Sequence, residues 1–274
     1  NYMTDKEIFQ KAYKKAINGG LSGFGAMTFQ VGSLMWLRTI VNYQYRNGGT
    51  FINTYKTLYK QGGIFRFYRG LPFALMQAPL SRFGDTAMNI GVMSLLENSD
   101  MNTASKTFIG SCGAATWRMC IMPIDTCKTT MQVNGAEGLK MLKNKIRRNG
   151  PSVLYHGSLA SASSTLVGHF PWFFTYNYLN EKISQQEGYK KLLRSALIGF
   201  SSSSISDICS NSLRVIKTNR QTSSSSISYV KLVKNIVEND SLLSLFTRGL
   251  KTKIITNGIQ GMCFTVMFDY LRKN

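Results

Sequence analysis

The chain alternates between long segments of small and apolar residues and short segments that are mainly polar. The long segments occupy roughly residues 16–45, 71–96, 105–133, 158–179, 192–222 and 250–271. Each is long enough to cross a hydrocarbon core as a helix, which takes about 20 residues. The polar segments with helical character are residues 50–61, 138–149 and 228–239. The pattern predicts an all-α membrane protein with six transmembrane helices and three short helices between them.

None of the six long segments is purely apolar, and the mean hydropathy of the chain is only −0.10. Lipid offers no hydrogen bonds to polar groups, so polar side chains at that depth must face a protein interior or a water-filled cavity. We therefore expect the polar residues of these segments to point into the bundle.

The sequence repeats with a period of about ninety residues. Arg38 lies 90 residues before Lys128, which lies 89 residues before Lys217. Each of these basic residues is followed by an aromatic-rich element that ends in glycine; the three elements are Phe67–Gly70, Tyr155–Gly157 and Phe246–Gly249. Several landmarks at matched offsets indicate internal repetition. We predict three repeats in one integral membrane domain, at residues 1–98, 99–186 and 187–274.

Composition narrows the function. The chain has 33 Lys and Arg against 13 Asp and Glu, a net charge of +20, which favours anionic partners. Its 43% of hydrophobic residues rules out intrinsic disorder. The basic residues are scattered rather than gathered on one reading helix, which argues against a nucleic-acid partner. The five cysteines form no CxxC pair, and no catalytic motif accompanies the two histidines, so we expect neither an enzyme nor a metal or cofactor.

One segment carries a recognisable motif. Pro123-Ile-Asp125-Thr-Cys-Lys128, followed by Gln132, resembles the signature of the mitochondrial carrier family, Pro-x-Asp/Glu-x-x-Lys/Arg. Gly63–Gly70 and Phe268–Arg272 resemble two further elements of that family, and the similarity covers nearly the whole chain. The resemblance implies three pseudo-symmetric repeats around a central cavity in the mitochondrial inner membrane. It also implies transport of a small metabolite by alternating closure of a matrix gate and a cytoplasmic gate.

The first and third repeats depart from this motif. Ser33 and Ser212 stand where the family has proline. Met35 and Arg214 stand where it has an acidic residue. Two of the three acidic gate positions are therefore lost.

The resemblance implies that the acid of each repeat pairs with the basic residue of the next. Asp125 should meet Lys217, whereas Met35 offers no partner to Lys128. Arg214 should face Arg38, like charge against like charge. The residues assigned to the matrix gate are Arg38, Asp125, Lys128, Gln132, Lys217 and Gln221, and those assigned to the cytoplasmic gate are Asp269 and Arg272.

Helical phase suggests residues that face the cavity. Arg118 lies seven residues before Asp125, and Asp207 lies seven before Arg214, so each pair shares a helix face. We expect Arg118 and Asp207 to lie at one level of the cavity, either as a substrate-binding ion pair or as a structural bridge between helices. Asp85, three residues from Arg82 on the same helix, is placed to neutralise that residue.

By the resemblance to the family, further positions on the even-numbered long segments are expected to face the cavity, and most of them are uncharged. The further candidate cavity residues are Gln77, Arg82, Ser164, Thr165, His169, Thr256 and Asn257. Arg118, Arg82 and His169 are expected to attract an anionic solute, while the amide and hydroxyl groups supply hydrogen bonds.

The phased glycines predict a second kind of site. They begin the even-numbered long helices, and the N-terminal amides of a helix bind phosphate readily. With the basic surface, this predicts binding of cardiolipin or another anionic lipid. The residues assigned to it are Tyr68, Arg69, Gly70, Gly157 and Gly249.

Two functions fit these observations. The first is transport of a small, anionic metabolite by a divergent carrier. The second is a structural role, in which the carrier fold serves as a subunit of a larger respiratory complex of the inner membrane and its gates have degenerated. A fold alone does not choose between them. We predict transport and keep the structural role as the alternative.

Overall fold

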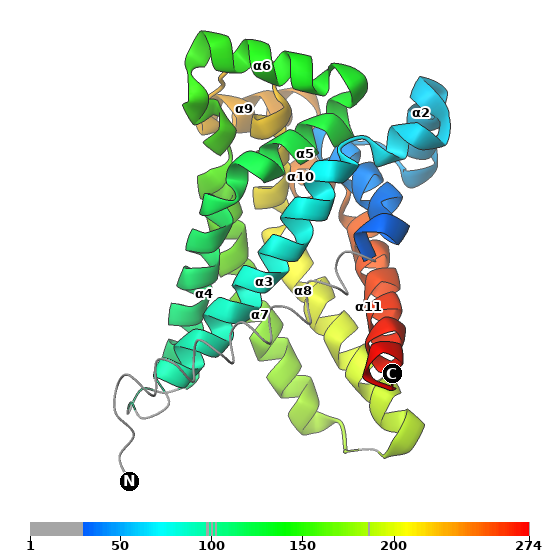
Figure 1. Ribbon diagram of the computed structural model, residues 1–274, viewed down its shortest axis with the longest axis vertical. Coiled ribbons are helices and arrows are strands. Elements are labelled where there is room, and N and C mark those ends of the chain that lie inside the picture. The colour runs from blue at the N-terminus through cyan, green and yellow to red at the C-terminus, as the bar shows by residue number, and fades with distance from the viewer. Residues whose placement is uncertain (1–29, 97–98, 100, 102, 186, 274) are drawn as a thin grey trace.

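The computed structural model describes residues 30–96, 99, 101, 103–185 and 187–273, and every regular element in this part of the chain is a helix. The all-α class predicted from the sequence is confirmed for these residues. The long helical elements are residues 30–47, α3 (Leu71–Leu95), α4 (Thr103–Cys120), α5 (Met122–Asn134), α7 (Ser158–Lys182), α8 (Gly188–Thr222) and α11 (Leu250–Lys273). The bundle that they form is shown in Figure 1.

Shorter elements connect the long helices. They are α2 (Phe51–Gly62), η1 (Gly63–Tyr68), η2 (Gly135–Glu137), α6 (Gly138–Asn149), η3 (Pro151–Tyr155), α9 (Tyr229–Asn239) and α10 (Leu242–Thr247). Helices α6 and α9 lie across one end of the bundle (Figure 1). The three short helices expected from the polar segments correspond to α2, α6 and α9.

The long helices follow the predicted segments with two differences: the segment 105–133 is divided into α4 and α5, and α8 begins four residues before its predicted start. Residues 16–29 of the first segment lie outside the described residues. By mean hydropathy, no helix in the described ranges has the 18-residue apolar window of a membrane span. The six membrane spans therefore stay a prediction.

The second repeat contains a helix break that the third lacks. Helix α4 ends at Cys120, Ile121 is not helical, and Pro123 occupies the first turn of α5. Proline fits there because its missing N–H would find no partner in a first turn. Helix α8 runs without interruption for 35 residues past Ser212, where the proline is absent. The break coincides with the proline, and the uninterrupted helix has serine at the matching position.

Glycines close the repeats into a ring. Gly70, Gly157 and Gly249 have left-handed φ angles of 85°, 91° and 66°, and each directly precedes α3, α7 or α11. A Cβ added to each would lie 3.1–3.3 Å from a carbonyl oxygen of a long helix in another repeat. These oxygens belong, in the same order, to Lys128, Lys217 and Val41. The first repeat therefore packs on the second, the second on the third, and the third on the first.

Basic side chains repeat this cyclic order at the helix ends. Arg66 donates to the carbonyl oxygens of Gln132 and Val133, both at 2.8 Å, at the end of α5. Lys145 donates to the carbonyl of Arg220 near the end of α8 (3.2 Å). Arg248 donates to the carbonyl of Arg46 at the end of segment 30–47 (3.1 Å). A cation at a helix C-terminus satisfies free carbonyls and complements the helix dipole.

Candidate functional site

A cavity of about 980 Å³ lies between the long helices. Most of the predicted cavity residues line it: Gln77, Arg118, Ser164, His169, Asp207, Thr256 and Asn257. Four predicted gate residues, Arg38, Asp125, Lys128 and Lys217, line it as well. Thr165 is absent from the lining, and its buried hydroxyl donates to the carbonyl of Ser161 in its own helix (3.1 Å). The side chains of Arg82, Asp269 and Arg272 lie outside the described residues.

Asp125 is the centre of a charged cluster where α5 meets α8. Its carboxylate lies 2.7 Å from the Nζ atoms of both Lys128 and Lys217. It also accepts a hydrogen bond from Gln221 Nε2 at 3.1 Å. Lys128 in turn donates to Gln77 on α3 (2.9 Å). The contact expected between Asp125 and Lys217 is therefore present, and one carboxylate, 4% exposed, holds two ammonium groups.

Gln132 and Gln221 each join two repeats. Gln132 accepts a hydrogen bond from Asn42 of segment 30–47 at 2.6 Å. Gln221 bonds to Thr126 (3.1 Å) as well as to Asp125. Both glutamines are buried and lie one turn beyond the basic gate residue of their repeat.

Arg214 does not face Arg38, contrary to the sequence expectation. Its guanidinium turns back along α8 and forms an ion pair with Asp207. Asp207 also accepts a hydrogen bond from Asn257 of α11, and Arg38 bonds instead to Gln260 Oε1 (3.4 Å). The physical reason is that an unpaired buried charge is costly, so Arg214 takes the carboxylate two turns away rather than oppose another cation.

The predicted contact between Arg118 and Asp207 is wrong. Arg118 bonds to Asp85 of α3, with 3.1 Å between Nε and Oδ1. Helices α3 and α4 pack directly on each other, so Asp85 is the nearer carboxylate. Asp85 is accordingly held by Arg118 of another helix, whereas a pairing with Arg82 of its own helix was expected.

His169 belongs to an aromatic wall of the cavity. Its Nδ1 lies 2.6 Å from the Ser111 hydroxyl oxygen, and its ring meets Phe173 edge-on at 6.1 Å. Trp172 packs edge-on against Phe173 at 4.9 Å and lines the same cavity. One side of the cavity is therefore aromatic while the other sides carry charges.

The cavity has an excess of positive charge. Among its described lining residues, six are Lys or Arg and three are Asp. Lys253 and Gln260 of α11 also line the cavity and were not among the predicted residues. The available signal was spacing: residues 253, 256, 257 and 260 recur at offsets of three, four and seven, which places them on one helix face.

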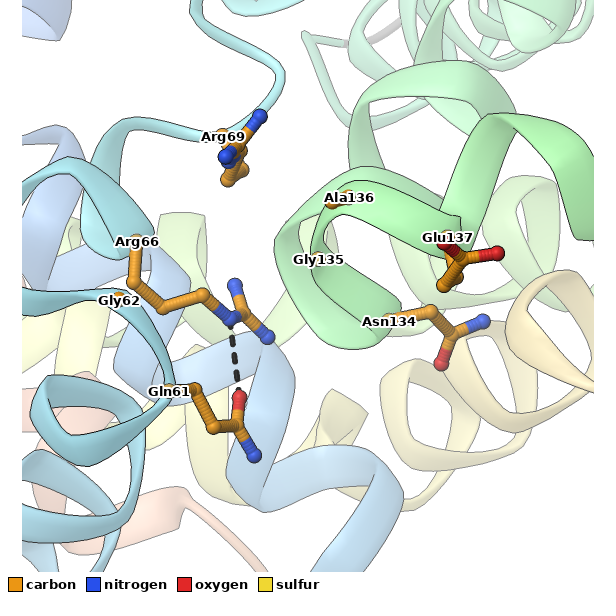
Figure 2. A pocket seen from close by; sticks show the side chains of 8 residues that line it. All are labelled: Gln61, Gly62, Arg66, Arg69, Asn134, Gly135, Ala136 and Glu137. Atoms are coloured by element: carbon orange, nitrogen blue, oxygen red, sulfur yellow. Dashed lines mark hydrogen bonds between the residues drawn. The ribbon is translucent and has the colours of Figure 1, made fainter.

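A second, smaller pocket of about 160 Å³ lies between η1 and η2 (Figure 2). Arg66 crosses it and donates to Gln61 Oε1 at 3.0 Å, while the exposed Arg69 lies at its edge. The predicted lipid residue Arg69 therefore lies beside a basic pocket that joins the first two repeats. In the described ranges, no group of three or more His, Cys, Asp or Glu residues could hold a metal ion.

Helical hairpins closed into a ring around a polar, charged cavity define a carrier-type protein. The family model described as mitochondrial carrier protein matches residues 99–187 and 188–274, more than half of the chain. The chain belongs to the mitochondrial carrier family, as its motifs predicted. Members of this family are transporters, which supports the expectation that the chain is not an enzyme.

Part of the chain is similar to a relative whose name states a solute. Over 188 residues the chain is 24% identical to the peroxisomal adenine nucleotide transporter 1 of Saccharomyces cerevisiae (strain ATCC 204508 / S288c). The match covers 56% of this chain and 57% of the yeast protein. The chain therefore spans less than two thirds of that relative.

Proposed function

We propose that the chain transports a small anionic solute across the mitochondrial inner membrane by alternating access. The observation that carries this proposal is the positively charged cavity, whose lining includes the Asp125–Lys217 ion pair. The excess of basic side chains attracts an anion, because a cavity lined by one sign of charge concentrates the opposite sign. Membership in a family of transporters supports the same function.

Helix length supports the membrane placement. Helices α3 and α7 have 25 residues each and α8 has 35, whereas a span needs about 20. Their polar residues contribute to the cavity lining, which is where a membrane helix tolerates such residues.

The ion pair of Asp125 and Lys217 forms the matrix gate in this proposal. It joins α5 of the second repeat to α8 of the third, so the two helices cannot separate without breaking it. Gln221 and Lys128 strengthen the closed arrangement through the same carboxylate. Opening toward the matrix replaces these contacts with contacts to water. Binding of the solute supplies part of the free energy for this opening.

Uptake by purified protein in liposomes tests the function. Labelled adenine nucleotides come first, because the yeast relative is named for them, followed by phosphate and dicarboxylates. We expect the wild type to accumulate at least one solute and Asp125→Asn to reduce the rate at least tenfold. Glu137→Gln removes the exposed Glu137–Lys140 ion pair and should leave uptake unchanged. Absence of uptake for the whole panel would contradict transport.

The alternative is a structural subunit of an inner-membrane respiratory complex. The loss of the acidic residue at position 214 favours it, since Arg214 pairs with Asp207 of its own helix and provides no ion-pair partner for Arg38 of the first repeat. Purification in mild detergent separates the two functions: recovery at fixed stoichiometry with a respiratory complex, together with no uptake, supports the structural role.

We further propose that the glycine-bounded helix starts bind anionic lipid such as cardiolipin. The basic pocket beside Arg69 and the left-handed Gly70 support this binding in the first repeat. Arg69→Gln should lower the lipid retained by the purified protein, measured by mass spectrometry. Arg147→Gln, an exposed change on α6, serves as the control.

A further inference from the structure

The charges of the cavity are unevenly paired. Three carboxylates line it among the described residues, and each is already engaged. Asp85 holds Arg118, Asp207 holds Arg214, and Asp125 holds both Lys128 and Lys217. Two basic lining residues, Arg38 and Lys253, form no ion pair with any described carboxylate.

These two cations occupy the same corner of the cavity. Arg38 comes from segment 30–47 and Lys253 from α11, and the two elements are joined where Gln30 donates to the carbonyl of Gln260 (3.0 Å). Arg38 donates to Gln260 Oε1, and Lys253 donates to Asn257 Oδ1 at 2.8 Å. The charge of Arg38 also acts on Lys253 through space. Asp207 acts on Lys253 as well, but its oxygens already accept from Arg214 and Asn257.

Two buried polar groups of α11 add to this corner. Thr256 is 1% exposed and Gln260 is 8% exposed, and both line the cavity. Neither Thr256 Oγ1 nor Gln260 Nε2 has a hydrogen-bond partner among the described residues. Buried polar atoms are nearly always bonded, so two such atoms beside two cations indicate a missing partner that accepts hydrogen bonds.

We propose that Arg38, Lys253, Thr256 and Gln260 form a subsite for a doubly charged oxyanion, such as the phosphate group of a solute. A guanidinium and an ammonium each donate charge-assisted hydrogen bonds to phosphate oxygens, and the amide and hydroxyl supply two more donors. The subsite lies between the first and third repeats. This inference deepens the proposed transport function and rests on it for the solute's route, but binding can be measured without transport.

Equilibrium binding to the full chain in detergent tests the subsite. The probe is inorganic phosphate, and malonate, a dianion of different shape, is the comparison. Binding of each is measured by calorimetry and by the rise in the melting temperature. Lys253→Met keeps the length of the side chain and removes its charge. We expect it to weaken phosphate binding roughly ten- to hundredfold, since one charge-assisted hydrogen bond is lost. Lys253→Arg keeps the charge and should restore most of the affinity.

Lys251→Met is the matched control, since Lys251 lies two residues away on α11, is exposed, and is absent from the cavity lining. It should change the affinity less than twofold. Without ligand, Lys253→Met should unfold at the same or a higher temperature than the wild type, because it removes an unpaired cation. A variant that simply misfolds would unfold earlier.

The outcomes separate the subsite from transport. Phosphate binding that depends on Lys253, without uptake of any solute in liposomes, supports the subsite and contradicts transport. If the wild type shows uptake and Lys253→Met changes neither uptake nor phosphate binding, the subsite is overturned. The proposed transport function still holds in that case. Wild-type protein that binds neither probe also overturns the subsite. Stronger binding of malonate than of phosphate would overturn the assignment to phosphate.

Discussion

The second and third repeats differ in how the charged residue of the motif region is paired. In the second repeat, Pro123 begins a new helix after a break, and Asp125 in its first turn reaches Lys217 of the next repeat. In the third repeat, α8 continues past Ser212, and Arg214 turns back to Asp207 in its own helix. A break with an acid thus yields an ion pair between repeats, whereas a continuous helix with a base yields an ion pair within one. The position of a single carboxylate decides which helices are tied together.

Removing that carboxylate should have the largest effect. Asp125→Ala leaves the half-buried Lys128 and Lys217 without their buried counter-ion, and breaking one side of a buried pair costs about 3–5 kcal/mol. We expect a large loss of thermal stability in detergent, measured by tryptophan fluorescence. Glu238→Gln, which removes the exposed Lys234–Glu238 ion pair, should lower the melting temperature much less.

Introducing the missing proline should come next. Ser212→Pro places proline inside α8, where it removes a backbone hydrogen bond and clashes with the preceding turn at a cost of about 3 kcal/mol. The reverse change, Pro123→Ser, should cost less than about 1 kcal/mol, since proline there lies in a first turn. Equal effects of the two substitutions on the melting temperature would show that the break does not depend on proline.

The pairing within α8 should have an intermediate effect. Asp207→Asn leaves Arg214 without its carboxylate, and we expect a loss of about 2 kcal/mol. Adding Arg214→Gln should recover part of this loss, because the double variant no longer has the charge of Arg214 without its carboxylate. A double variant as unstable as the sum of the two single variants would contradict the ion pair.

We expect the smallest effect on stability from the histidine just before α7. His156 precedes Gly157 where the third repeat has Arg248 before Gly249. Burial, with the nearby charges of Lys145 and Arg220, lowers the pKa of His156 to about 4. The folded state therefore binds fewer protons than the unfolded chain between about pH 6.5 and pH 4, so stability falls as the pH decreases through this window.

His156→Gln should flatten that part of the stability curve, measured by thermal unfolding at each pH. His169→Gln, the matched change at the other histidine, should leave the contribution of His156 in place. Identical pH profiles for wild type and His156→Gln would refute the assignment.

The repeats could be predicted from fixed offsets along the sequence, whereas the Asp125–Lys217 contact was expected from the resemblance to the mitochondrial carrier family. The expectation failed for Arg118, since helical phase gives the direction of a side chain but not which neighbouring carboxylate lies nearest. It failed for Arg214 because the family pattern places that residue opposite Arg38, although helical phase puts Asp207 and Arg214 on the same face. Asp85 was nearer to Arg118 than Asp207 was, and that depends on how α3 packs on α4. Lys253 was missed because the positions carried over from the family lay one turn further along the helix.

The cyclic capping of helix ends by Arg66, Lys145 and Arg248 has a consequence for assembly. Each repeat supplies the cation that completes a helix in the following one, and the third completes the first. A fragment of two repeats would leave the carbonyls of one helix end without their cation and one cation without its carbonyls. Each repeat therefore depends on the other two. Pulled from one end, the molecule should lose all three hairpins in a single event rather than in three steps.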